Sequence, residues 1–175
     1  MKFVTAVALV MLWVPVDGVA QSGIRLVGDW AIEQSEDPFT DEKNSKISLS
    51  AFDERRIKAL NIDCDGNEAI LNVFTEPLVG SDTWTGPNPD RVKEVSLTYR
   101  LGDDPAITVT APIVTVPGAP WYYVFHNGLE SSEISALISS PRIAVRVQGV
   151  RETIQTNWTD LEGTTEAVRS LHCVR

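Results

Sequence analysis

The chain has 175 residues, a formal net charge of −9 and an isoelectric point of about 4.7. Phosphate binding needs a basic face, so this charge argues against a nucleic-acid ligand and against electrostatic docking on anionic lipid. A chain of this length makes one ordinary domain with a sizeable core.

The N-terminus has the parts of a secretory signal peptide. Lys2 supplies the charged start, residues 3–16 form an apolar run, and small residues end the segment. The run is shorter than the roughly 20 residues of a membrane-spanning helix, which disfavours the alternative of an uncleaved anchor. We therefore expect a signal peptide over residues 1–20, cleaved after Ala20, and a periplasmic or secreted β-rich domain over residues 21–175.

Apolar and polar residues alternate over most of the chain that follows. Val95, Leu97 and Tyr99, for example, alternate with polar side chains. This period of two is typical of a strand with one buried and one solvated face. The expected strands span residues 27–34, 46–51, 60–64, 68–74, 94–100, 107–116, 121–126, 142–148 and 152–158.

Turn residues separate these strands. Asp65-Gly66 lies between two strand-like runs and predicts a tight hairpin. Residues 102–105 and Asn127-Gly128 predict further turns. The glycines and prolines of residues 80–90 predict an exposed loop.

Two short helices are expected among the strands. Ser131 or Ser132 is placed to cap a helix over residues 133–139, and Thr164 to cap one over residues 165–171. Many short strands with few helices predict a mainly β fold: an antiparallel β-sandwich or barrel-like sheet with one or two short helices.

The chain has two cysteines, Cys64 and Cys173, both in the expected mature domain. Two cysteines in an oxidising compartment generally pair, so we expect a disulfide that ties an early strand to the C-terminus. A pair of metal ligands is the alternative. No CxxC spacing occurs, however, and the nearest histidine, His172, is adjacent to Cys173.

Residues 63–67 carry oxygen ligands at the spacing that opens an EF-hand calcium loop. The glycine falls at the fourth position rather than the sixth, and no helical pattern flanks the segment. An Asp-Gly hairpin explains the same residues more simply. We therefore expect no metal ion and no cofactor.

The order of landmarks along the chain resembles a family of exported proteins. Trp30 is followed by an acidic turn at residues 37–41, the mid-chain Cys64, a Tyr-Arg strand at residues 99–100 and a C-terminal segment that ends in Cys173. The chain is similar in this order to the small exported β-domains related to the TagO-like accessory proteins of type VI secretion. The resemblance implies a periplasmic protein without known catalysis that contacts envelope components, and it supplies no catalytic residues.

Residues suited to catalysis are sparse. His126 is interpreted as a surface histidine at a strand end, and His172 lies beside a cysteine expected to be oxidised. Neither a GxSxG nor an HExxH motif occurs. The acidic residues fall almost entirely in expected turns, where Asp bonds the local backbone. A hydrolase that uses Asp37 or Asp41 is the least favoured interpretation, and we expect a protein that is not an enzyme.

A basic patch is one candidate binding site. Arg100, Arg142 and Arg146 lie on the expected solvated faces of two strands. If those strands are neighbours, the guanidinium groups are suited to bidentate capture of a carboxylate or phosphate. The alternative is ordinary cross-strand pairing of the arginines with Glu94 or Glu152.

Aromatic residues are the second indication of a binding surface. Trp84 lies in the polar loop of residues 80–90, where burial is harder to arrange. Exposed aromatic side chains anchor protein partners and sugars, so Trp84 is also a candidate binding residue. Trp30, Trp121 and Trp158 are instead expected in the core.

Together these features predict an exported, non-enzymatic accessory or binding protein that contacts an envelope protein or a cell-wall component. Neither nucleic acid nor a membrane span after signal cleavage is expected. The alternative function is a periplasmic inhibitor that blocks a cell-wall hydrolase through the loop of residues 80–90, because a rigid, disulfide-tied domain loses little entropy on binding. No pattern in the sequence indicates an oligomeric state.

Overall fold

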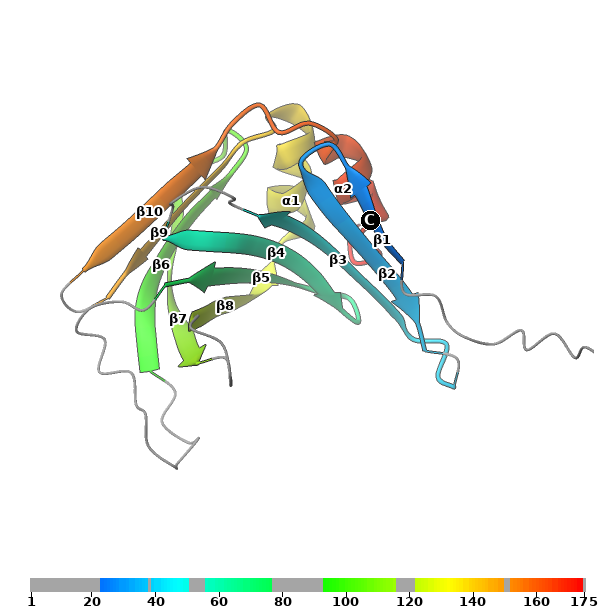
Figure 1. Ribbon diagram of the computed structural model, residues 1–175, viewed down its shortest axis with the longest axis horizontal. Helices are drawn as coiled ribbons and strands as arrows, with labels where there is room; N and C mark the ends of the chain where they lie inside the picture. The colour runs from blue at the N-terminus through cyan, green and yellow to red at the C-terminus, as the bar shows by residue number, and fades with distance from the viewer. Residues whose placement is uncertain are drawn as a thin grey trace, which may run out of the picture.

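The computed structural model describes residues 23–37, 39–50, 56–76, 93–115, 122–149 and 152–174. The expected signal peptide and the loop of residues 80–90, which contains Trp84, lie outside the described residues, as does Trp121. The elements, shown in Figure 1, are β1 Gly23–Val27, β2 Trp30–Glu36, β3 Lys43–Ser50, β4 Ile57–Asp65, β5 Glu68–Thr75, β6 Lys93–Leu101, β7 Ile107–Thr115, β8 Tyr122–Leu129, α1 Ser131–Ser139, β9 Ile143–Gln148, β10 Thr153–Trp158 and α2 Thr164–Ser170.

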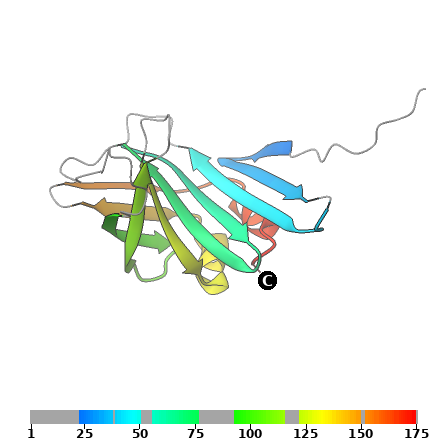
Figure 2. The ribbon, with the colours of Figure 1, turned by 90° about the horizontal axis from the view of Figure 1, so that it is seen from below.

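The strands form one antiparallel sheet in the order β1-β2-β3-β4-β5-β8-β7-β6-β9-β10. The sheet bends strongly, but β1 and β10 stay as its two edges and it does not close into a barrel (Figures 1 and 2). Helices α1 and α2 pack against each other, with α1 on β6 and α2 on β1, β2 and β3. The expected mainly β, antiparallel fold with two short helices is confirmed.

The core lies on the face of the sheet that the helices cover. In β6, Val95, Leu97, Tyr99 and Leu101 are buried, while the residues between them are half-buried or exposed. The same alternation holds for β3, β9 and β10. The alternating pattern of the sequence therefore identifies the buried face of these four strands correctly, because successive side chains of a strand point to opposite faces.

The single strand expected over residues 27–34 is wrong, because two strands meet there. β1 and β2 are joined at Gly28, whose φ is +57°. A Cβ on Gly28 would lie 2.3 Å from the carbonyl oxygen of Glu162, and a Cβ on Gly163 would lie 2.3 Å from that of Val27. The two backbones approach so closely that only glycine fits at either position. The sequence pattern does not reveal this contact, since its two sides are far apart in the chain.

The turn expected at Asn127-Gly128 is also wrong. Strand β8 continues through it to Leu129, and the pairing of β5 with β8 shifts register between Ala69 and Ile70. Ala69 pairs with Leu129, whereas Ile70 pairs with Asn127. Gly128, with a φ of +84°, is the extra residue of a β-bulge. A glycine beside an asparagine marks either feature, so local sequence alone does not separate them.

The hairpin expected at Asp65-Gly66 is confirmed. Asp65 pairs with Glu68, and the two residues between them form the turn that joins β4 to β5. Gly66 has a φ of +58°, the left-handed conformation that a tight hairpin of this kind requires. The oxygen ligands that resemble the start of a calcium loop are therefore part of this hairpin.

Helix α1 begins two residues earlier than expected. Its N-cap is Glu130, not Ser131 or Ser132. The main-chain N–H of Glu130 donates to Glu133 Oε2 at 2.7 Å. This contact, in which a glutamate three residues into the helix reaches back to the cap, is part of a capping box.

Helix α2 begins one residue earlier than expected, with Gly163 as its N-cap. Thr164 is not the cap because its hydroxyl is used elsewhere. It donates to the carbonyl oxygen of Leu161 at 2.8 Å and accepts from the indole N–H of Trp30 at 3.0 Å. The fully buried Trp30 is thus tied to the start of α2. Within the ranges that the structure describes, no helix is long and apolar enough to cross a membrane.

The expected disulfide between Cys64 and Cys173 is confirmed, with 5.6 Å between the two Cα atoms. It joins β4 to the segment that follows α2. His172 strengthens the connection, because its Nδ1 lies 2.8 Å from Ser45 Oγ and its Nε2 lies 2.8 Å from the carbonyl oxygen of Gly66. A carbonyl oxygen only accepts, so Nε2 carries the proton and Nδ1 accepts from the Ser45 hydroxyl.

Candidate functional site

The outer face of β6 and β9 carries the candidate site. The two strands are antiparallel neighbours in which Arg100 lies opposite Ala144 and Thr98 lies opposite Arg146. Arg100 and Arg146 are therefore diagonal neighbours on one face, at a separation that long side chains readily span. The condition on which the predicted basic patch depended, adjacency of the two strands, is met.

A shallow groove of about 420 Å³ lies over this part of the sheet. Strands β6, β9 and β10 contribute most of its lining, and both arginines are exposed. Apart from these two arginines, the described residues that line the groove carry no charged group. Its outward-facing lining residues are Thr98, Arg100, Ala144, Arg146, Gln155 and Asn157.

Neither arginine of the groove has a carboxylate partner among the described residues. Arg146 Nε donates to Gln155 Oε1 at 3.2 Å, which uses one of the five N–H donors of the guanidinium group. The side chain of Arg100 makes no hydrogen bond or ion pair with any residue in the described ranges. The groove therefore presents two positive charges to solvent.

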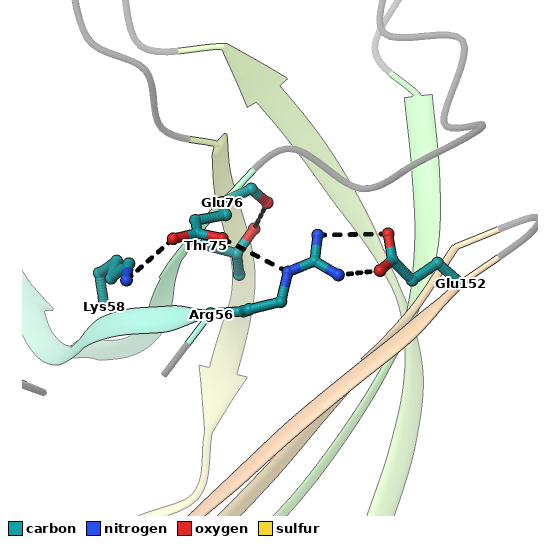
Figure 3. Close-up of polar contacts among 5 residues, drawn as sticks. All are labelled: Arg56, Lys58, Thr75, Glu76 and Glu152. Atoms are coloured by element: carbon teal, nitrogen blue, oxygen red, sulfur yellow. Dashed lines mark hydrogen bonds and ion pairs between the residues drawn. The ribbon is translucent and has the colours of Figure 1, made fainter. Parts of the chain in front are cut away.

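The glutamates expected to pair with the arginines lie elsewhere, so that alternative is wrong. Glu152 forms a bidentate ion pair with Arg56, in which Nη1 contacts Oε1 and Nη2 lies 3.2 Å from Oε2 (Figure 3). Glu94 lies opposite Pro112, towards the other end of β6 from Arg100. The positions of the strands determine which side chains can pair. The linear sequence does not show that Arg56, rather than an arginine of the groove, is the partner of Glu152.

Arg142, the third residue of the predicted patch, is engaged in other contacts. Its Nη2 lies 3.1 Å from Asp103 Oδ1, and its Nε donates to Ser140 Oγ at 2.8 Å. Asp103 belongs to the turn between β6 and β7, which the backbone brings beside the start of β9. The charge of Arg142 is compensated locally, so the groove depends on the other two arginines.

The cluster that holds Glu152 has a structural role (Figure 3). Arg56 Nε lies 3.4 Å from one carboxylate oxygen of Glu76, and Lys58 Nζ lies 2.9 Å from the other. The hydrogen bond from Lys58 lowers the pKa of Glu76, and the charge of Arg56 acts in the same direction. These contacts tie the start of β4 and the end of β5 to the segment that enters β10, although β10 is not their neighbour in the sheet.

The groove is suited to binding an oxyanion. A guanidinium group offers parallel N–H donors that match the two oxygens of a carboxylate or phosphate. The hydroxyl of Thr98 and the amide of Gln155 add neutral hydrogen-bonding groups beside the charges. No histidine, cysteine or carboxylate is found among the described residues that line the groove. The arrangement offers charged and neutral hydrogen-bond donors that match an anionic group.

The hydroxyl–imidazole pair of Ser45 and His172 is not among the sites expected from the sequence. A pocket of about 390 Å³ borders both residues. Ser45 is only 5% exposed, and its Oγ also accepts the main-chain N–H of His172 at 3.0 Å. These contacts hold the C-terminal segment against β3 and the β4–β5 turn. A serine at an inward position of an alternating strand is the signal that could have revealed the pair.

A polar network on the outer face of β4, β5 and β8 is a second feature that was not expected from the sequence. The Tyr123 hydroxyl donates to Asn72 Oδ1 at 2.7 Å, and Asn72 Nδ2 donates to Asp63 Oδ2. Burial raises the pKa of Asp63, an effect opposed by Lys46 and by the Asn72 hydrogen bond. Asp63 Oδ1 is buried with no hydrogen-bond partner in the described chain. The other carboxylate oxygen, Oδ2, accepts the Asn72 hydrogen bond, so the network links the outer faces of β4, β5 and β8.

The remaining aromatic predictions divide between the core and the part of the chain that is not described. Trp30 and Trp158 are 0% and 9% exposed, which confirms their expected place in the core. Trp84 lies outside the described residues, so its role as a binding residue stays a prediction.

Comparison of the chain with protein-family models, curated proteins and solved structures finds no match. The resemblance to TagO-like accessory proteins of type VI secretion therefore stays a prediction based on the sequence landmarks.

Proposed function

We propose that the chain is an exported, non-enzymatic binding protein that contacts an envelope protein or a cell-wall component through an anionic group held between Arg100 and Arg146. The observation that carries the proposal is the placement of two exposed guanidinium groups on one face, without a carboxylate partner among the described residues. Two like charges this close repel each other, and an anion between them removes the repulsion.

Two further features support export. The N-terminal segment has the pattern of a signal peptide, and Cys64 and Cys173 form a disulfide, a bond that persists mainly in oxidising compartments. In such a compartment, carboxylates are offered by protein termini and acidic side chains and by the peptides of the cell wall. The groove recognises the chemistry that these sources share.

The test is an NMR titration of the purified protein with trialanine, whose free C-terminal carboxylate is the probe. The C-terminal amide of the same peptide is the matched control without the charge. We expect the acid, and not the amide, to shift the backbone resonances of β6, β9 and β10. The double variant Arg100→Gln/Arg146→Gln is expected to weaken binding at least about tenfold, because each charge-assisted hydrogen bond contributes about 1.5–3 kcal/mol.

Arg169→Gln is the control variant, because Arg169 is an exposed arginine on α2, remote from the groove. It is expected to bind the acid as the wild type does. Equal binding of the acid and the amide, or binding that survives in the double variant, would refute the assignment of the site.

The source of the anion is tested separately. Co-sedimentation with purified peptidoglycan that is lost in the Arg100→Gln/Arg146→Gln variant would assign a cell-wall ligand. Crosslinking to a single envelope protein that depends on the same arginines would assign a protein partner. If neither occurs, the proposed function fails even where trialanine binds.

A further inference from the structure

Strand β1 is an edge of the sheet with an apolar outer face. It pairs with β2, and no other described strand lies along its second side. Ile24 and Leu26 are 69% and 76% exposed, and they lie opposite Glu33 and Ala31 of β2, on the face away from the helices. The other edge, β10, differs in that its exposed residues are polar: Thr153, Gln155 and Asn157.

Within its described residues, β1 is a short edge strand that has no proline, bulge or outward charge. Native proteins protect edges with outward charges, prolines or bulges, because unpaired backbone groups beside apolar side chains invite another strand. The only charged residue of β1 is Arg25. Its guanidinium group turns to the opposite face and contacts Glu166 of α2.

The hairpin determines which backbone groups of β1 point outward. A two-residue turn joins β1 to β2, so Val27 and Trp30 are the closing, hydrogen-bonded pair. Hydrogen-bonded and non-hydrogen-bonded pairs alternate along an antiparallel ladder. Ile24 and Leu26 therefore direct their N–H and C=O groups away from β2, towards the free edge.

We propose that β1 pairs antiparallel with β1 of a second copy of this chain, with the two-fold axis at Arg25. This register places Ile24 opposite Leu26 of the other copy, so the outward backbone groups bond each other and both apolar pairs lie on one face. The same operation brings the two Arg25 side chains together beside the two Glu166 carboxylates, which compensate their charge. One two-fold operation thus pairs the outward backbone groups, covers part of the apolar face and compensates the charges. An isologous interface requires this self-complementarity.

The pairing involves one short strand from each copy, so we expect a weak dimer of the small-interface class. The test is sedimentation velocity of the purified protein from about 1 µM to about 300 µM, a range in which such interfaces assemble. A shift from monomer to dimer with rising concentration is expected. Ile24→Lys should raise the dissociation constant at least about tenfold, because an exposed lysine protects an edge.

Phe39→Lys is the matched control, because Phe39 is 94% exposed and lies in a turn outside the sheet. It removes a large exposed apolar side chain without touching β1, and it should leave the dissociation constant unchanged. Circular dichroism of both variants checks that they fold. A protein that stays monomeric over the whole range, or dimerisation that Ile24→Lys leaves unchanged, would overturn the proposal.

The register is tested by crosslinking through an added cysteine. In the proposed dimer the two Arg25 residues form a non-hydrogen-bonded pair with Cα atoms about 4.5 Å apart, which suits a disulfide. Arg25→Cys should therefore crosslink under mild oxidation. Ile24→Cys should not, since the equivalent Cα atoms are offset to about 8 Å. Crosslinking of Ile24→Cys in place of Arg25→Cys would refute the register. These experiments do not involve the arginine groove, so their outcome is independent of the proposed function.

Discussion

Removal of the Cys64–Cys173 disulfide is expected to cause a large loss of stability. The two residues are 109 positions apart, so the bond closes most of the described chain into one loop. In the chain-entropy relation, a loop of this size corresponds to about 4.8 kcal/mol near room temperature, and measured values for native bridges fall between about 2 and 5 kcal/mol. With a urea m-value of about 2 kcal/mol per molar, the double variant Cys64→Ala/Cys173→Ala should unfold about 1–2.5 M earlier.

The assay is urea unfolding followed by tryptophan fluorescence, with the reduced wild type as the matched control. Reduction breaks the bond but keeps both sulfur atoms, so agreement between the reduced protein and the double variant would assign the loss to the covalent link. The m-value should also rise, because the unfolded chain expands once the loop is opened. A loss below about 1 kcal/mol, or an unchanged m-value, would refute the reasoning.

Two further predictions concern backbone strain and pH. Gly28→Ala and Gly66→Ala introduce a Cβ at nearly the same positive φ, but only the first meets another backbone, at 2.3 Å. In urea unfolding, Gly66→Ala should lower the free energy of unfolding by about 1–2 kcal/mol, and Gly28→Ala should lower it clearly more. Equal losses in the two variants would show that the backbones of Gly28 and Glu162 are not in close contact. Burial raises the pKa of Asp63 in the folded state above its ordinary value of 3.8, so the folded protein binds this proton more strongly than the unfolded chain does. The folded protein therefore loses stability as the pH rises from the ordinary pKa to the raised one. The free energy of unfolding of Asp63→Asn, relative to that of the wild type, should therefore rise from about pH 4 upward and then level off. If the difference between the two free energies does not change with pH, the burial of the carboxylate is contradicted.

Much of the fold is encoded locally and was predicted on that basis. The alternation of Val95, Leu97 and Tyr99 identifies the buried face of β6, because successive side chains of a strand point to opposite faces. The hairpin at Asp65-Gly66 is predicted because its turn requires a left-handed conformation, which glycine adopts readily. The disulfide follows from the presence of only two cysteines and an expected oxidising compartment.

The errors occur where distant parts of the chain meet. Gly28 lies in a turn that the backbone of Glu162 approaches closely. Gly128 lies in a bulge because β5 pairs with the residues of β8 on either side of it. Thr164 does not cap α2, since the indole of Trp30 takes its hydroxyl. In each case the local sequence permits two conformations, and a contact from far along the chain selects one.

The sequence by itself determined which residues of β6 and β9 face solvent, and therefore that Arg100 and Arg146 are exposed. Only the tertiary structure decided that β6 and β9 are neighbours, which makes the two guanidinium groups diagonal partners. It also decided that Glu152 binds Arg56 and leaves the groove without a carboxylate among the described residues. The physical reason is that the direction of a side chain follows from the local period of a strand, whereas its partners follow from strand order, which only the packing of the whole sheet establishes.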